Sequence, residues 1–453
     1  MTFRCLPVLT VDFLTFPSMI QAGNPADSVK SDTKKDKVKT GWNFGGLPIL
    51  AYDSDMGLQY GALANIYYYG DGSTYPQYFH SLYFEVSRYT KGTGINQFFF
   101  DSKKLIPKIR VTTDITYLTE KALNFYGFNG YESVYHHPWE NSKEDTSVYK
   151  TRMFYRYQRD LLRIGASFQG KFFQKNLLWL AGFTYLQIYT GQVNVDRLNR
   201  GVKQSKKLPN VPGLYENYVK WGILGKDSAG GINNFIKLGL IYDTRDNEPN
   251  PMHGIWDEAV LAVAPGFIGD GHYSFIKLSV IHRQYFTLVK EFLSLVYRIG
   301  YQGTIAGKAP YYVQSYMINS FSQTTTIDGL GGSQTLRGIL RNRVVGDGVV
   351  YGNAEIRWKF IRFHWIKQNF YLALNAFADA GMVVQPIAIN KSGIPDKYLS
   401  AYFSSDKESP HLALGAGFRI VMNQNFIICA DYGQAMDIRD GSNGIYVGLG
   451  YLF

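Results

Sequence analysis

Two neighbouring segments, residues 348–360 and 368–379, alternate between polar and apolar side chains, and each carries an acid on its polar side. The acids are Glu355 in VYGNAEIRWKF and Asp379 in FYLALNAFAD. A period of two with one polar and one apolar face is typical of a β-strand. In a soluble sheet the apolar face would form the core. In a transmembrane barrel it meets lipid, and both acids point into the lumen.

A glycine-rich segment, LGGSQTLRG, precedes these strands and contains Arg337. Its glycines, Gly331, Gly332 and Gly338, favour backbone angles that other residues resist. A buried arginine needs a partner, because an unpaired charge away from water costs several kcal/mol. Since two inward acids follow, we predict a long loop that folds into the lumen and is locked there by Arg337. The alternative is a solvated Arg337 in an external loop.

The composition favours a membrane barrel over a soluble sandwich. The chain has 453 residues, with 35 Tyr, 30 Phe and 46 Gly. No segment reads as an apolar run long enough for a transmembrane helix, which needs about 20 residues. The closest, residues 176–195, is interrupted by Gln187, Thr190 and other polar residues. Many strands without such a run predict an all-β fold, an antiparallel transmembrane β-barrel.

We predict about sixteen strands, an even number that leaves both ends of the barrel on one side. A further crossing would break this parity, so Gly46 to Tyr52 is predicted to lie in the lumen. The predicted strands are 57–69, 78–91, 93–103, 106–119, 148–158, 160–173, 175–191, 232–244, 252–265, 271–285, 289–304, 348–360, 368–379, 410–421, 425–434 and 444–453.

Four long connections separate these strands, and structureless connections of this length are uncommon unless they are functional. With this strand assignment, the connections 191–231, 305–347 and 380–409 fall on the outer side. The connection 120–147 falls on the opposite, periplasmic side.

The N-terminal residues are predicted to lie outside the barrel. Residues 1–22 resemble a signal peptide, because Arg4 precedes the mostly apolar residues 6–20 and small residues follow. Residues 23–40 are polar and charged and are predicted to be a disordered tether. The barrel is then expected over residues 41–453.

The last predicted strand, GIYVGLGYLF, is amphipathic and ends on an aromatic residue. An exposed terminal aromatic is costly in water and favourable at a lipid interface. It also resembles the signal by which outer-membrane barrels are recognised for insertion. The predicted lipid face consists of Ile445, Val447, Leu449, Tyr451 and Phe453, and the opposite face contains Gly444, Gly448 and Gly450.

The net charge of +11 could indicate an anionic partner. The basic residues are scattered, however, and the loop Arg197 to Lys207 reads more simply as a solvated loop than as a site for lipopolysaccharide or another anion. We find no zinc spacing, no phosphate-binding loop and no nucleic-acid motif, and so predict no metal, no cofactor and no nucleic-acid partner. Cys5 and Cys429 imply no disulfide framework.

A barrel enzyme would need a histidine near the rim with a nucleophile or an acid beside it. The candidates are His136, His137 and His411, and none has a spaced nucleophile that stands out. We therefore predict no catalytic residues and no enzymatic activity.

Three separated motifs resemble the BamA/TamA-type outer-membrane insertase superfamily, the bacterial surface antigen barrels, over residues 41–453. LGGSQTLRG is similar to the inward-folded sixth loop of that family, with Arg337 at its tip. FADAG is similar to its F-x-D-x-G strand motif, with Phe377, Asp379 and Gly381, and Glu355 matches an acid on the strand between them. YDTRDNEPNPMHG is similar to a turn between the middle strands, with matching residues Asp243, Arg245, Asp246, Pro251 and Gly254.

The resemblance implies how the lock would be built. Arg337 would donate forked hydrogen bonds to Asp379, with Glu355 nearby and the Phe377 ring stacked on the guanidinium. Two positions depart from the family pattern. Leu336 stands where valine is common, and Ile339 replaces an aromatic residue, so one aromatic contact would be missing.

The resemblance also implies a function. First and last strands form a lateral seam in this family, and we expect clients or lipids to exchange through it here. The sequence leaves no room for the family's periplasmic domains, so we expect a barrel-only member in the outer membrane of a Gram-negative bacterium. Its expected partners are outer-membrane lipids, unfolded or exported protein clients, and separate periplasmic proteins or lipoproteins. The alternative is a plugged passive pore or a membrane anchor for a larger complex.

Overall fold

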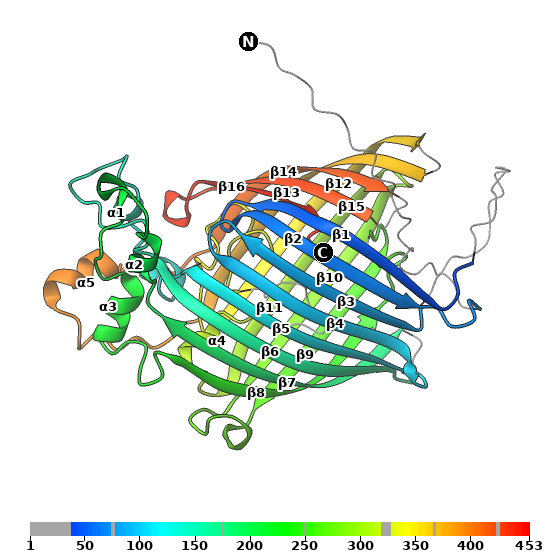
Figure 1. Cartoon of the computed structure of the whole chain (residues 1–453), viewed down its shortest axis with the longest axis horizontal. Helices are drawn as coiled ribbons and strands as arrows, with labels where there is room; N and C mark the ends of the chain where they lie inside the picture. Colours follow the sequence, from blue (N-terminus) through cyan, green and yellow to red (C-terminus); the bar gives the residue numbers. More distant parts are fainter. Residues whose placement is uncertain are drawn as a thin grey trace, which may run out of the picture.

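The computed structural model describes residues 38–73, 78–173, 176–248, 250–318, 328–365, 368–422 and 426–453. Sixteen antiparallel strands form one closed barrel in which each strand pairs with the next, and β1 pairs with β16 (Figure 1). This confirms the predicted all-β barrel. The strands are β1 (Trp42–Asp53), β2 (Gly57–Tyr68), β3 (His80–Tyr89), β4 (Thr93–Ile106), β5 (Ile109–Asn124), β6 (Arg156–Lys171), β7 (Leu177–Gly191), β8 (Gly230–Asp243), β9 (Gly254–Ala264), β10 (Phe275–Val289), β11 (Leu293–Gly307), β12 (Gly348–Trp365), β13 (Gln368–Gln385), β14 (His411–Met422), β15 (Phe426–Ala435) and β16 (Asn443–Leu449).

The two ends of the barrel differ. One end, which we call the long-loop end, carries the connections 125–155, 192–229, 308–347 and 386–410 and is capped by short helices (Figure 1). The other, the short-turn end, receives the start of β1 and the end of β16. The helices are α1 (His137–Glu140), α2 (Val195–Leu198), α3 (Leu214–Lys220), α4 (Tyr311–Gln314) and α5 (Asp396–Tyr402), with 3-10 turns η1 (Gly130–Glu132), η2 (Gln204–Lys206), η3 (Gly266–Ile268) and η4 (Ile438–Asp440).

Two strand predictions were wrong, and the errors cancel in the count. The segment Gly46 to Tyr52 belongs to β1, because a strand at a seam tolerates the glycines and the proline that read as breakers. The predicted strand 148–158 is mostly loop, since Phe154 and Tyr155 are buried in an aromatic cluster at the long-loop end. The connection before β6 therefore lies at the long-loop end, and its predicted place on the opposite side was also wrong.

The wall of the barrel is apolar outside and charged inside. Along β12, Ile356 and Trp358 are 49% and 50% exposed on the outer face, whereas Glu355 and Arg357 are 1% and 2% exposed in the lumen. Water would not favour this arrangement, but lipid around the wall would. No helix in the described ranges is long and apolar enough to cross a membrane.

Aromatic side chains close the long-loop end. A buried cluster, which we call the dome, joins residues of the connections 125–155, 192–229 and 386–410. Phe125 and Tyr218 meet edge to face with ring centroids 5.4 Å apart, and Trp221 and Tyr402 do so at 5.0 Å. Such pairs contribute about 0.5–1.5 kcal/mol each beyond their buried area. The dome therefore holds loops from distant parts of the sequence together.

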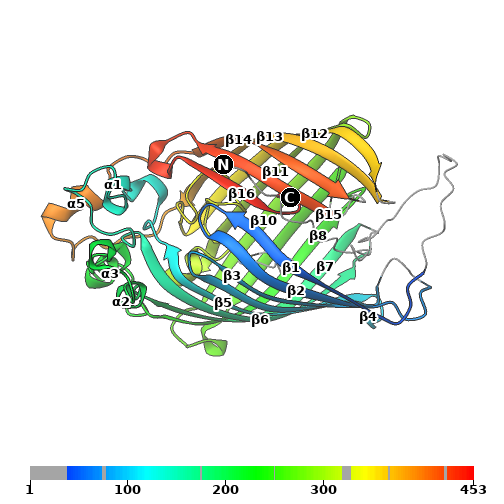
Figure 2. The same cartoon turned by 45° about the horizontal axis from the view of Figure 1, so that its top comes forward.

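The seam between β1 and β16 is the shortest joint in the barrel. Figure 2 shows these two strands side by side. Within the described part of the chain, β1 pairs with β2 along its whole length of 12 residues but with β16 at only two positions, Tyr52 with Val447 and Asp53 with Tyr446. Both positions lie near the long-loop end.

Candidate functional site

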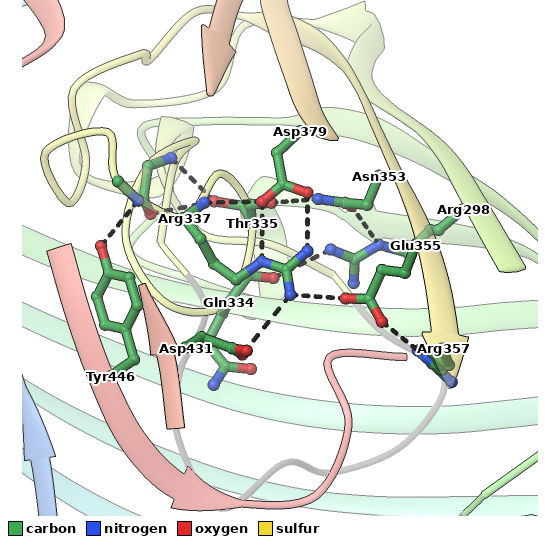
Figure 3. Close-up of polar contacts among 12 residues, drawn as sticks. Arg298, Gln334, Thr335, Arg337, Asn353, Glu355, Arg357, Asp379, Asp431 and Tyr446 are labelled. Atoms are coloured by element: carbon green, nitrogen blue, oxygen red, sulfur yellow. Dashed lines mark hydrogen bonds and ion pairs between the residues drawn. The ribbon is translucent and has the colours of Figure 1, made fainter. Parts of the chain in front are cut away.

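The lumen contains a buried ion-pair network centred on Arg337 (Figure 3). Its Nε and Nη2 donate to the two carboxylate oxygens of Asp379, each at 2.9 Å, and its Nη1 donates to Glu355 at 2.6 Å. The Arg337 backbone N–H also donates to Asp379, at 3.0 Å. The guanidinium lies 3.4 Å from the centroid of the Phe377 ring, and Asp431 on β15 lies 3.6 Å from Nη1. The structure thus brings together the four residues expected to form the lock.

Burial makes this network energetically demanding. Arg337, Glu355 and Asp379 are each 1% exposed. Burial lowers the pKa of Arg337, but the Glu355 and Asp379 carboxylates outweigh it and raise that pKa above its usual range, so the guanidinium stays charged. A buried ion pair of this kind contributes little net stability. Removing one partner, however, leaves an uncompensated buried charge that costs about 3–5 kcal/mol.

Glycines let the loop lie directly against the barrel wall. Gly331, Gly332 and Gly338 all have positive φ, of 115°, 80° and 95°. A Cβ on Gly338 would approach the backbone of Gly433 on β15 to 2.5 Å, and a Cβ on Gly433 would come as close to the carbonyl carbon of Arg337. The loop and β15 therefore touch backbone to backbone, which only a pair of glycines permits.

This contact predicts a large difference between two glycines near the end of the chain. Gly433→Ala should push the loop off β15 and destabilise the barrel by about 1–3 kcal/mol, the usual effect of overpacking. Gly448→Ala is the matched control, because its Cβ would meet only the Cys429 sulfur, at 4.0 Å. The midpoint of heat-induced unfolding, followed by the shift in gel migration, measures both. Equal midpoints for the two variants would contradict the close contact.

The two residues that differ from the family pattern, Leu336 and Ile339, pack against other apolar side chains. Leu336 and Ile339 are buried with Leu330 and Val344 in an aliphatic cluster inside the barrel. Apolar packing of the loop thus takes the place of the missing aromatic contact. In addition, the Gly338 N–H donates to the Tyr446 hydroxyl on β16 at 3.1 Å, so the loop also reaches the seam.

A second anchor of the loop was missed by the sequence analysis. Arg159 on β6 donates to both carboxylate oxygens of Asp328 in the loop, at 2.6 and 2.7 Å, and to Glu120 on β5 at 2.7 Å. Arg341 donates to Glu120 at 2.8 Å and to Asp328 at 3.1 Å. Arg159 is fully buried, like the two acids. The loop therefore spans the lumen, with Arg337 fixed to β12 and β13 and this second anchor fixed to β5 and β6.

The turn motif between β8 and β9 lies at the short-turn end. Arg245 donates to both carboxylate oxygens of Asp243, at 3.0 and 2.7 Å, and stacks on Trp256 at 3.9 Å. Asp246 accepts the N–H groups of residues 252 and 253 at 3.0 and 3.2 Å. Gly254 has φ 112°. These contacts shape a tight turn.

Pro251 in this turn is buried. The five turn residues identified from the sequence therefore all lie between the end of β8 and the start of β9: Asp243, Arg245, Asp246, Pro251 and Gly254.

The end of the chain corrects one prediction. Ile445, Val447 and Leu449 lie on the outer face, 47%, 37% and 66% exposed, but Tyr451 and Phe453 turn into the lumen. Gly444 and Gly448 belong to β16, which ends at Leu449, and Gly450 follows with φ 88°. This left-handed turn breaks the alternation on which the prediction rested.

Arginines in the lumen hold the inward-turned residues. The guanidinium of Arg357 lies 4.1 Å from the Tyr451 ring and donates to the backbone oxygen of Phe453 at 3.0 Å. Arg298 lies 5.1 Å from the Phe453 ring. Cation–π contacts of this kind contribute about 0.5–2 kcal/mol each and strengthen where water is excluded. They are the physical reason why these aromatic residues lie inside rather than against lipid.

The histidines considered as enzyme candidates have other contacts. The two ring nitrogens of His411 lie 2.6 Å from Asp440 and 3.2 Å from Glu408, so carboxylates occupy both. His136 contacts the carbonyl of residue 401 at 2.9 Å, and His137 pairs with Glu144 at 2.6 Å. The contacts of His136 and His411 join separate segments at the long-loop end, and that of His137 lies within the connection 125–155. Among the described residues, no cluster of His, Cys, Asp and Glu could hold a metal ion.

Comparisons with known proteins agree with this architecture. The model of the Omp85 superfamily domain matches residues 80–453. Among solved structures, BamA from Haemophilus ducreyi lacking POTRA domains 1–3 is similar, with a TM-score of 0.52 and 12% identity over 91% of this chain and 71% of that one. CdiB from Acinetobacter baumannii gives a TM-score of 0.46 and 12% identity, over 91% of this chain and 60% of that one. No curated protein matches by sequence. The family model covers most of the chain, so the protein belongs to the Omp85 superfamily. This confirms the family resemblance that the sequence motifs indicated.

Proposed function

We propose that this protein inserts or exports other proteins at the outer membrane of a Gram-negative bacterium, through the seam between β1 and β16. The observation that carries the proposal is the brevity of that seam, with two paired positions against twelve on the other side of β1. An unpaired strand edge presents a row of N–H and C=O groups, which is a template for another strand. A client strand could therefore add to β1 before it leaves into the lipid.

The filled lumen supports a lateral route. The inward loop spans the barrel between its two anchors, and the dome covers the long-loop end. A chain that entered from the short-turn end would meet the lock and the dome before it reached the outside. Opening the seam needs the loss of only a few backbone hydrogen bonds.

In this proposal the long-loop end faces the exterior and the short-turn end faces the periplasm. Separate periplasmic proteins or lipoproteins would deliver unfolded clients to the short-turn end. We propose no enzymatic step, since a strand exchange of this kind needs no bond cleavage.

A reversible crosslink across the seam tests the proposal. Cysteines at Tyr52 and Val447, which are paired and both exposed on the outer face, should form a disulfide in a Cys5→Ser, Cys429→Ser background. In liposomes, the oxidised protein should insert a urea-denatured barrel client far more slowly than the reduced protein, as measured by the client's protease resistance. The control pair, Trp358→Cys with Leu374→Cys, joins β12 to β13 at two outward positions.

The outcomes separate the two candidate functions. Inhibition by the seam disulfide alone, reversed by a reductant, would support insertion through the seam. Undiminished insertion with the seam crosslinked would contradict it. If neither form inserts the client and the protein gives a steady conductance in planar bilayers, the plugged pore would be favoured. That conductance should be small, because the loop fills the lumen.

A further inference from the structure

Two buried arginines face each other on the inner wall of the barrel. Arg283 on β10 and Arg298 on β11 are directly opposite in the antiparallel register, and both are buried. Like charges that lie directly opposite in a sheet destabilise it. The pair lies in the half of the lumen nearer the short-turn end, because β11 begins at that end, at Leu293. Two such cations need negative charge beside them.

Acidic side chains compensate only one of the two charges. The Glu258 carboxylate accepts from Nη1 of Arg283 at 2.7 Å. Arg298 has neutral acceptors instead, because its Nε donates to the Asn353 side-chain oxygen at 2.9 Å and its Nη2 donates to the Gln334 carbonyl at 3.2 Å. Within the described ranges, no acid forms an ion pair with Arg298. Two cations and one carboxylate therefore leave a surplus of one positive charge.

The guanidinium of Arg283 also has an unused donor. Its Nε is buried, and none of the residues that the structure describes accepts a hydrogen bond from it. A buried donor without an acceptor bears the full cost of its desolvation. The ring of Trp256, whose centroid lies 3.7 Å from this guanidinium, offers a π face but no oxygen. The surplus charge and the Nε donor thus both favour a further, anionic acceptor.

A cavity of about 70 Å³ lies between the two arginines and the inward loop. Figure 3 shows Arg298 reaching towards Gln334 of that loop. Gln334 is exposed although it lies in the lumen, so the cavity is open to solvent inside the barrel. A space of this size holds a group of only a few heavy atoms. The residues that carry the argument line it from the wall and from the loop: Arg283, Arg298, Trp256, Gln334 and Thr335.

We propose that this cavity binds a small carboxylate, held between the guanidinium groups of Arg283 and Arg298. The planar fork of a guanidinium matches the two oxygens of a carboxylate, and charge-assisted hydrogen bonds are stronger than neutral ones. One carboxylate carries one negative charge, which equals the surplus around the cavity. This inference goes beyond the proposed function and does not depend on it.

The same residues connect the cavity to the loop. Arg298 donates to the Gln334 carbonyl, and Asn353, which accepts from Arg298, donates to the Thr335 carbonyl at 2.7 Å. A ligand stabilises the state that binds it. A carboxylate on Arg298 should therefore stabilise the loop in its inward position, two residues before the lock at Arg337.

Acetate tests the proposal on the intact protein in detergent, because it carries a carboxylate on a single methyl group. The wild-type protein should broaden the NMR signal of ¹³C-labelled acetate. When acetate replaces chloride at constant ionic strength, the midpoint of the heat-induced gel shift should rise, and protease cleavage within residues 308–347 should slow. No broadening, or equal midpoints and cleavage rates in acetate and chloride, would overturn the proposal.

Two variants should change acetate binding in opposite directions. Arg298→Gln removes the surplus charge and should weaken binding on the order of tenfold or more. Glu258→Gln raises the surplus from one charge to two and should strengthen binding, which general damage to the wall would not do. The gel shift verifies that each variant is folded, and Glu258→Gln carries the test if Arg298→Gln does not fold. Weaker binding by Glu258→Gln, or unchanged binding by a folded Arg298→Gln, would overturn the proposal.

A second probe identifies the source of the carboxylate. A free small acid and an acidic side chain of a polypeptide share this chemistry, so acetate is compared with N-acetylaspartate N-methylamide, which carries the group on a peptide backbone. Binding of acetate alone would support the site and assign it to free acids. Binding of both, each weakened by Arg298→Gln, would support the site and extend it to acidic side chains that enter the lumen.

Discussion

Replacing Arg337 by alanine should destabilise the barrel by about 3–5 kcal/mol. The substitution leaves Asp379 and Glu355 buried beside each other, with Glu355 still paired to Arg357 at 2.7 Å and Asp379 without its forked partner. It also removes the stacking on Phe377 and frees one end of the loop. The loss should appear as a lower midpoint of the heat-modifiable gel shift and as new protease cleavage within residues 308–347.

A second variant distinguishes the charge from the bulk of the side chain. Arg337→Lys keeps a cation but cannot match both oxygens of Asp379 as the planar guanidinium does. We expect it to fall between the wild-type protein and Arg337→Ala in both measurements. Wild-type midpoints and wild-type protease patterns for both variants would show that the lock does not hold the loop.

Replacing Arg159 by alanine should have an effect of similar size at the other wall. Glu120 and Asp328 would remain buried with only Arg341 between them, so the loss is again about 3–5 kcal/mol. Since Asp328 belongs to the loop, the same protease assay should report cleavage near it. Lys121→Ala on β5 is a suitable control, because its ion pair with Asp160 is partly exposed and should contribute less than about 1 kcal/mol.

The double variant Arg337→Ala with Arg159→Ala tests how the two anchors relate. If each fixes its own end of the loop, either single variant leaves the other end attached, and the double variant releases the loop fully. Loss of protease resistance should then exceed the sum of the single effects, a coupling that a double-mutant cycle measures. Strict additivity would mean that the anchors stabilise the wall without acting through the loop.

The sequence predicted the first anchor and not the second for a physical reason. Glu355 and Asp379 lie in the middle of long amphipathic strands, where alternation fixes the face of each residue. Glu120 lies one residue beyond the predicted strand 106–119, and Arg159 lies between the predicted strands 148–158 and 160–173. Their loop partners, Asp328 and Arg341, belong to no periodic pattern, so nothing indicated which wall they would reach.

The fold class and the number of strands could be predicted because both depend on the repeated pattern of many segments. The two ends of the sheet were harder. At β1, glycines and a proline obscured the strand signal that its pairing with β2 reveals. At β16, the alternation continues in the sequence to Phe453, but the positive φ of Gly450 ends the strand in the structure. A period of two identifies faces only while the backbone stays extended.

The short seam also has a mechanical consequence. A closed barrel of sixteen strands has sixteen joints between neighbouring strands, and a force that widens the barrel acts on all of them. The joint between β1 and β16 has two paired positions, whereas the joint between β1 and β2 has twelve, so we expect the β1–β16 joint to part first. We expect the other strands to stay paired, so that the barrel widens and closes again at this joint without unfolding.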